Sequence, residues 1–260
     1  MMKTNLAFLS LAFAGMMCCS VLNAQPKVVA HRGHWDCEGS AQNSIASLRN
    51  AAKLGIYGSE FDVQMTSDLV PIVNHDPKIN GLVIAETKFK DLKNQKLKNG
   101  EKVSTLEQYL KEGRKHHELQ LILEIKIQPN EMMEKAAVDE TVRLVKKLKM
   151  EKQINYISFS KFICDQLRAA FPYAEVAMLS DKYDPTATKE ACLSGVDYNY
   201  KVFKKNPKWI KQCREKGLNI NVWTVDKPEM IQSFIDKDVD FITTNNPVVA
   251  QELINKKYAK

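Results

Sequence analysis

Short apolar segments rich in β-branched residues alternate with helix-like segments along most of the chain, and this alternation limits the possible folds most strongly. The first pair is Lys27–Ala30 (KVVA) followed by Asn43–Leu54, where apolar residues recur at helical spacing. Such alternation indicates βα units around a parallel sheet. Eight units in about 235 residues predict a (β/α)8 barrel, an α/β fold. The alternative is an open doubly wound sheet, but no GxGxxG follows the first strand.

The remaining elements follow the same rhythm with one exception. The second strand is expected at Ser59–Met65, with Pro71–Asn74 as its extended partner. Further strands are expected at Leu119–Ile127, Tyr156–Ser160, Glu175–Leu179, Val196–Tyr200, Asn219–Val225 and Asp240–Thr243. Further helices are expected at Asn130–Met150, Phe162–Phe171, Thr186–Leu193, Pro207–Lys216 and Pro228–Asp236. The exception, residues 77–100, is rich in Lys and Asn and weakly periodic. We expect it to form a small insertion after the second strand, over the barrel mouth.

The first 24 residues have the composition of an export signal. Lys3 precedes a long apolar run, and a small residue, Ala24, stands near the expected cleavage point. This pattern predicts a secretory signal peptide at 1–24 and a single barrel domain at 25–260. Cys18 and Cys19 suggest a lipid anchor, but neither follows Gly or Ala, so a lipoprotein is less favoured. We expect an exported protein, periplasmic or secreted, with no transmembrane span in the mature chain.

The composition excludes several classes of protein. Hydrophobic residues make up 44% and charged residues 27% of the chain, as in ordinary folded globular proteins. The net charge is +7, but the lysines are scattered along the chain. Nucleic-acid binders usually concentrate basic residues on one face, so no nucleic-acid partner is expected. The sequence leaves the oligomeric state open.

Two histidine motifs come directly after extended apolar segments. His31-Arg32-Gly33 follows the first strand, and His75-Asp76 ends the segment VPIVNHD. Barrel enzymes carry their chemistry at the carboxyl ends of the strands. Histidines with an ordinary pKa near 6.5 can act there as general acid and base. Taken alone, a histidine such as His31 after a strand is more often a simple loop residue than a catalytic one.

Carboxylates occupy two of the predicted strands. Alternate residues of a strand share a face, so Glu60 and Asp62 point the same way, as do Glu124 and Lys126. Two carboxylates inside a barrel would repel each other unless protonated, paired or bound to a cation. The alternatives are a solvent-facing edge strand for the first pair, and a plain Glu–Lys ion pair for the second. Residues two apart in a strand reach each other poorly.

Together these residues point to a more specific chemistry. Glu60, Asp62 and Glu124 would make a hard-oxygen site suited to Ca²⁺ or Mg²⁺. Arg32 and Lys126 add positive charge suited to an anionic phosphate. The sequence therefore predicts one divalent cation beside a phosphate-binding pocket.

The ordered set HRG, SEFDVQMTSD, VNHD, EIK, NVWTVD and ITTNNP resembles the glycerophosphodiester phosphodiesterase family, from about Val28 to Val249. The resemblance implies a (β/α)8 barrel that cleaves glycerophosphodiesters to glycerol 3-phosphate and an alcohol with a divalent cation. The implied roles are catalysis for His31 and His75, metal binding for Glu60, Asp62 and Glu124, and substrate binding for Arg32, Lys126, Asn43 and Trp223. Within that last group, Arg32 and Lys126 would bind the phosphate and Trp223 would line the alcohol pocket.

Several positions depart from the family pattern. Gln42 replaces the Glu of the Pro-Glu-Asn-Thr stretch, and Asn245 replaces the Asp of the closing Thr-Asp-x-Pro. Leu69 replaces a hairpin Gly, and the usual Arg-Thr-Thr after His-Asp is absent from 77–86. The two lost carboxylates favour an alternative, a non-catalytic exported binder of phosphorylated small molecules. A second alternative is another barrel hydrolase, such as a glycosidase, which would use two carboxylates without the histidines.

Overall fold

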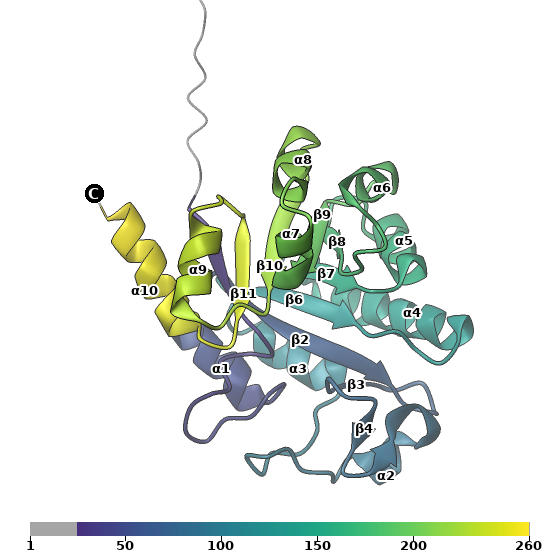
Figure 1. Cartoon of the computed structure of the whole chain (residues 1–260). Coiled ribbons are helices and arrows are strands. Elements are labelled where there is room, and N and C mark those ends of the chain that lie inside the picture. Colours follow the sequence, from purple (N-terminus) through teal and green to yellow (C-terminus); the bar gives the residue numbers. More distant parts are fainter. Residues whose placement is uncertain (1–24, 260) are drawn as a thin grey trace, which may run out of the picture.

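The computed structural model describes residues 25–259, so the predicted signal peptide lies outside the described residues. Eight parallel strands form a closed barrel (Figure 1) in the order β1-β2-β6-β7-β8-β9-β10-β11, and β1 pairs with both β2 and β11 to close it. The predicted (β/α)8 barrel is therefore confirmed. Its strands are β1 (Lys27–Ala30), β2 (Gly58–Met65), β6 (Gln120–Ile125), β7 (Ile154–Ser158), β8 (Val176–Met178), β9 (Gly195–Asn199), β10 (Asn219–Trp223) and β11 (Phe241–Thr244).

Helices follow the strands and cover the outside of the barrel (Figure 1). They are α1 (Ile45–Lys53), α3 (Leu106–Gly113), α4 (Glu131–Leu148), α5 (Lys161–Ala170), α6 (Pro185–Glu190), α7 (Tyr200–Lys205), α8 (Trp209–Glu215), α9 (Pro228–Ile235) and α10 (Pro247–Tyr258). Several begin at a polar cap: the Ser160 side chain, for example, accepts a hydrogen bond from the backbone of Ile163. Such caps satisfy backbone donors that have no partner inside the helix.

The stretch between β2 and α3 forms a small subregion beside the barrel. β3 (Pro71–Val73) pairs antiparallel with β2, and a separate two-stranded sheet follows. This sheet consists of β4 (Lys78–Ile79) and β5 (Leu82–Val83), and the subregion also contains the 3-10 helix η1 (Ile84–Glu86) and α2 (Phe89–Leu92). Five buried residues give the subregion its own apolar core: Ile72, Ile79, Ile84, Leu92 and Val103.

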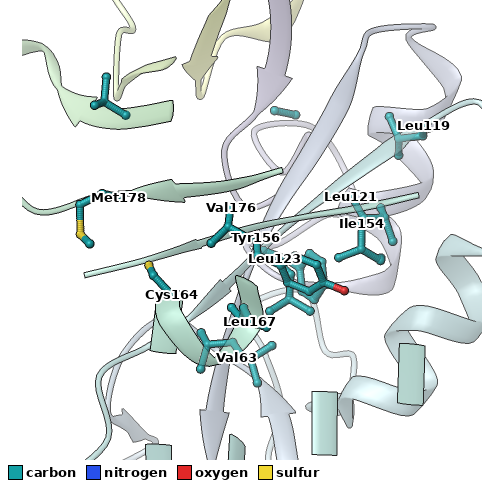
Figure 2. Close-up of a cluster of buried hydrophobic side chains, with 14 of the residues drawn as sticks. Val63, Leu119, Leu121, Leu123, Ile154, Tyr156, Cys164, Leu167, Val176 and Met178 are labelled. Carbon is teal, nitrogen blue, oxygen red and sulfur yellow. The ribbon is translucent and has the colours of Figure 1, made fainter. Parts of the chain in front are cut away.

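Strand alternation divides the barrel residues between two environments. Leu121 and Leu123 of β6 point outward, into the large core between strands and helices (Figure 2). Ile122, between them, points into the barrel and packs with Val29 and Ile157 in a smaller internal cluster. The same alternation holds in β2, whose eight residues are all buried. Because Phe61 and Val63 belong to the outer core, Glu60 and Asp62 face the barrel interior.

One alternative is excluded, and two expected elements had wrong bounds. β2 is not an edge strand, because β1 and β6 pair with it on both sides. The strand predicted at Val196–Tyr200 ends at Asn199, whose side chain caps α7 by accepting a hydrogen bond from the Lys201 backbone. The single helix predicted at Pro207–Lys216 is preceded by α7 and begins only at Trp209. No helix among the described residues is both long and apolar enough to cross a bilayer.

Candidate active site

The three predicted carboxylates meet at the carboxyl end of β2 and β6. Asp62 and Glu124 are direct partners in the parallel register of the two strands, and Glu60 lies one inward position before Asp62. Each carboxylate offers an oxygen within 4.8 Å of the other two, and all three residues are buried. These buried acids therefore form one cluster, which could hold a divalent cation.

Two cationic side chains border this cluster, both only 17% exposed. Lys126 Nζ lies 3.4 Å from Asp62 Oδ1 and 2.7 Å from Glu124 Oε1. The second distance shows that the Glu124–Lys126 pair does form, although we expected a poor fit. Lys126 follows the last residue of β6, so the chain has left the regular strand geometry that would keep the two side chains apart. Arg32 Nε lies 3.7 Å from Asp62 Oδ2.

The loop after β1 bends so that its backbone also contacts the carboxylates. Arg32 has a φ of 58°, and its backbone N–H donates to Glu60 Oε2 at 2.8 Å. Gly33 allows the turn, because its φ is 80° and a Cβ there would lie 2.4 Å from Ser47 Oγ. Asn43, with a φ of 60°, donates from Nδ2 to Asp62 Oδ2 and accepts from the Asp62 backbone. The implied substrate-binding Asn43 is thus a direct partner of Asp62.

The pKa values of the three carboxylates indicate that the cluster lacks full compensating positive charge from residues 25–259. Burial, followed by the charges of Asp62 and Glu124, raises the pKa of Glu60 well above its ordinary value. Burial and Asp62 likewise raise the pKa of Glu124 to about 8. Burial would also raise the pKa of Asp62, but Lys126, His75 and the Asn43 hydrogen bond together lower it. Glu60 Oε1 is buried without a hydrogen-bond partner among the described residues, so the donor set fits a hard cation.

Both predicted histidines border the cluster. His31 follows β1, and burial together with the Arg32 charge lowers its pKa to about 4. The ring is therefore neutral at pH 7 and can accept a proton. His75 follows β3; its carbonyl accepts from Gln64 Nε2 at 2.9 Å, and its Nδ1 lies 2.7 Å from Asp76 Oδ1. A positive charge on His75 would lower the pKa of Asp62, and the charge of Asp62 in turn raises the pKa of His31, so both rings are electrostatically linked to Asp62.

Trp223, at the end of β10, packs edge-to-face against Phe159 and donates from Nε1 to the Asp197 carbonyl. A cavity of about 690 Å³ adjoins the site at Gln42 and Asp76, between the loop after β1 and the subregion that contains β4. Trp223 does not line that cavity. Its role in an alcohol pocket stays a prediction.

Sequence reasoning missed the contacts of Trp35 and Asp226. Trp35 Nε1 donates to Asn245 Oδ1 at 3.0 Å, and Asn245 Nδ2 donates to Asp226 Oδ2 at 2.9 Å. Asp226 stands in the motif NVWTVD, but its carboxylate alone carries no signal of a partner on another strand. Gln42, noted only as a lost carboxylate, accepts a 2.7 Å hydrogen bond from Arg32 Nη1.

Comparisons with known proteins agree with this site. Residues 31–249 match the model of the Glycerophosphoryl diester phosphodiesterase family. The chain is 25% identical to the glycerophosphodiester phosphodiesterase of Caldanaerobacter subterraneus subsp. tengcongensis over 249 residues, 88% of this chain and 98% of that protein. The chain therefore belongs to the glycerophosphoryl diester phosphodiesterase family and is an enzyme, a phosphoric diester hydrolase.

Solved structures show the same relationship. The crystal structure of a glycerophosphodiester phosphodiesterase from Parabacteroides distasonis matches with a TM-score of 0.89 and 43% identity, over 91% of this chain and 99% of that one. An Oleispira antarctica phosphodiesterase, solved with the product sn-glycerol-3-phosphate, matches in fold with a TM-score of 0.77 and 21% identity, over 89% and 97% of the two chains. Neither the binder nor the glycosidase alternative is favoured by these matches.

Proposed function

We propose that this protein hydrolyses glycerophosphodiesters to glycerol 3-phosphate and an alcohol, with Glu60, Asp62 and Glu124 holding one divalent cation, Ca²⁺ or Mg²⁺. The observation that carries the proposal is the buried three-carboxylate cluster, which contains an unpartnered Glu60 oxygen and lies between two cationic side chains. Without an added positive charge, burial and mutual repulsion raise the pKa of Glu60 and of Glu124, so these two carboxylates would take up protons. A divalent cation would replace those protons and let all three carboxylates bind it in ionised form.

The side chains around the cluster divide the chemical work. When bound, the cation would supply Lewis-acid polarisation of the phosphoryl group. Arg32 and Lys126 would bind the non-bridging phosphate oxygens and stabilise the charge that develops on them. His31 and His75 would supply the general base that deprotonates the nucleophile and the general acid that protonates the leaving alkoxide. The cavity of about 690 Å³ beside Gln42 would receive part of the substrate.

We also propose where the protein acts and which kind of alcohol leaves. The Lys3-containing leader supports export to a periplasmic or extracellular space, where small glycerophosphodiesters would be the substrates. The side chains around the cavity carry both signs of charge, among them Lys78, Lys96, Asp36 and Glu38. Such a mixed lining suits a polar alcohol more than an apolar one.

The test is a panel of glycerophosphodiesters assayed after the protein is stripped of divalent ions and again after Ca²⁺ or Mg²⁺ is restored. We expect release of glycerol 3-phosphate that disappears on stripping and returns with the cation. His31→Ala and His75→Ala should each lower the rate by roughly 10²–10⁴-fold on the restored protein. Equal turnover with and without the cation would contradict the metal role. Near-wild-type turnover by both histidine variants would contradict the acid–base roles.

A further inference from the structure

Asn245 connects His31 to a carboxylate outside the three-carboxylate cluster. His31 Nδ1 lies 2.9 Å from Asn245 Oδ1, and the same oxygen accepts the indole N–H of Trp35 at 3.0 Å. On its other side, Asn245 Nδ2 donates to Asp226 Oδ2 at 2.9 Å. The four side chains form the chain Asp226–Asn245–His31, with Trp35 attached at the amide oxygen. They come from the loops after β1, β10 and β11.

The orientation of the Asn245 amide is fixed from both sides. An indole N–H can only donate, so the amide atom that faces Trp35 must be the oxygen. An ionised carboxylate can only accept, so the atom that faces Asp226 must be the NH₂ group. The two constraints agree, and a flipped amide would violate both of them. His31 Nδ1 therefore meets an acceptor, and its hydrogen bond requires that Nδ1 carry the proton.

The Asp226 carboxylate, which accepts the Asn245 amide, is itself fixed by further hydrogen bonds. Its Oδ1 accepts the backbone N–H of Asn245 at 2.8 Å and the Thr244 hydroxyl at 3.2 Å. Its backbone carbonyl accepts from Asn246 Nδ2 at 2.9 Å. The backbone N–H of His31 in turn donates to the Thr244 carbonyl at 2.9 Å. The loops after β10 and β11 and the start of the β1 loop thus form one hydrogen-bonded unit.

We propose that Asn245, oriented by Asp226 and Trp35, is a positioning residue that holds neutral His31 in the Nδ1–H tautomer, so that Nε2 accepts the proton of the nucleophile. In a neutral imidazole only one nitrogen carries hydrogen, and the hydrogen bond at one nitrogen decides the state of the other. Within residues 25–259, no hydrogen bond engages His31 Nε2. This assignment rests on the proposed phosphodiesterase function for the role of Nε2, but not for the tautomer.

The choice of an amide has a consequence for the base. A carboxylate at this place would stabilise the imidazolium as well as orient the ring. The neutral amide orients the ring and stabilises its charged form much less, which suits a group that must start neutral. The low pKa of His31, caused mainly by burial and the Arg32 charge, agrees with this. His75 differs, because its Nδ1 faces the ionisable side chain of Asp76 at 2.7 Å.

The tautomer can be measured directly by ¹⁵N NMR of the full chain labelled at its histidines, with the His31 signals assigned from their loss in His31→Gln. We expect wild-type His31 at pH 7 to show a protonated Nδ1 and an unprotonated Nε2. A wild-type spectrum with the proton on Nε2 would overturn the proposal without any further variant. In Asn245→Leu, which removes the acceptor at similar size, we expect a mixture of the two tautomers.

Asn246→Ala is the matched control, because it breaks one hydrogen bond to Asp226 and leaves the contact between Asn245 and His31 in place. Its His31 spectrum should equal that of the wild type. An unchanged spectrum in Asn245→Leu, or equal changes in both variants, would contradict a positioning role for the amide.

Activity supplies the second readout, on the protein restored with cation. Asn245→Leu should lower kcat by about tenfold or more, below the full 10²–10⁴-fold cost of losing a general base, with little change in KM. A change in KM alone would contradict the role in proton transfer. If wild-type protein cleaves no glycerophosphodiester, the proposed function fails, whereas the NMR spectrum still decides the tautomer.

Discussion

Buried acidic side chains occur in two parts of the barrel interior, and among the described residues only one of these parts has cationic side chains paired with its carboxylates. Glu60, Asp62 and Glu124 lie together at the carboxyl end of β2 and β6, beside Arg32 and Lys126. Asp197 lies across the barrel on β9, beside a small internal cavity that Val29 and Ile122 also line. Its Oδ1 is buried and has no hydrogen-bond partner among the described residues. Burial raises the pKa of Asp197 to about 7, and Asn221 offsets only part of this effect.

The difference shows what distinguishes a binding site from a tolerated polar residue. Among residues 25–259 no cationic side chain compensates Asp197, and taking up a proton is the simplest way to reduce the free-energy cost of burying its carboxylate. In the cluster, two cations, the Asn43 amide and the Arg32 backbone N–H keep Asp62 ionised and position Glu60. That arrangement would be costly if it served stability alone, because buried ion pairs often lose more in desolvation than they gain. We infer that the cluster is retained for a ligand and Asp197 for packing.

The largest expected effect separates the two sites by activity. Asp62→Asn should lower kcat/KM by roughly 10³-fold, because several kcal/mol of transition-state stabilisation would depend on the proposed cation site. Asp197→Asn, an identical change at the other buried acid, should leave turnover close to that of the wild type. Both variants are assayed with restored cation, after thermal unfolding confirms that they are folded. Equal losses in the two variants would contradict the distinction.

The fold was largely predictable because its signals are local. β-branched runs such as KVVA indicate strands, and the apolar spacing between them indicates helices, without information from distant residues. Eight strand–helix units in a row are compatible with few folds other than the barrel. The errors arose where local signals compete. Tyr200 continues the alternating pattern of Val196 and Tyr198, yet Asn199 can cap a helix with its own side chain, and the chain turns there. A strand propensity assigned to each residue separately does not include this competition between strand extension and helix capping.

The site was predictable in its strand-borne part and not in its loops. The two-residue spacing of Glu60 and Asp62 placed both on one face, and the barrel brought Glu124 opposite Asp62. The reach of Lys126 to Glu124 depends on where β6 ends, which the sequence does not specify to one residue. The contact of Asn245 with His31 joins residues 214 positions apart through two loops. Their side-chain directions follow from tertiary packing alone.

The second prediction concerns stability, and it sharpens the description of Asp197. Its pKa is raised from 3.8 to about 7 in the folded protein. The folded state therefore holds a proton that the unfolded state releases, and this contribution is fully present below pH 4 and lost as the pH rises to about 7. Asp197→Asn cannot titrate. The free energy of unfolding of the variant, relative to the wild type, should thus rise by a few kcal/mol between pH 4 and pH 8.

Denaturant unfolding of both proteins across this pH range, at one fixed cation concentration, gives that difference directly. The titration of all other groups cancels between the two proteins. A difference that stays constant with pH would show that Asp197 is ionised in the folded protein, and the contrast with the three-carboxylate cluster would then disappear.

The smallest expected effect concerns the neutral partner of Arg32. Arg32 Nη1 donates to Gln42 Oε1 at 2.7 Å, so the guanidinium keeps charge that a carboxylate there would compensate. In Gln42→Glu the new carboxylate would compete with the substrate phosphate for Arg32. A partly exposed pair of this kind is worth about 0.2–1 kcal/mol, so KM should rise by up to about fivefold, and kcat should change less.

Gln42→Met, which removes the hydrogen bond without adding charge, is the matched control. A higher KM in Gln42→Glu than in Gln42→Met would assign the effect to charge. Equal KM values in the two variants would mean that Gln42 acts on Arg32 only through its hydrogen bond. A charge at position 42 would then have no effect on how Arg32 binds the substrate.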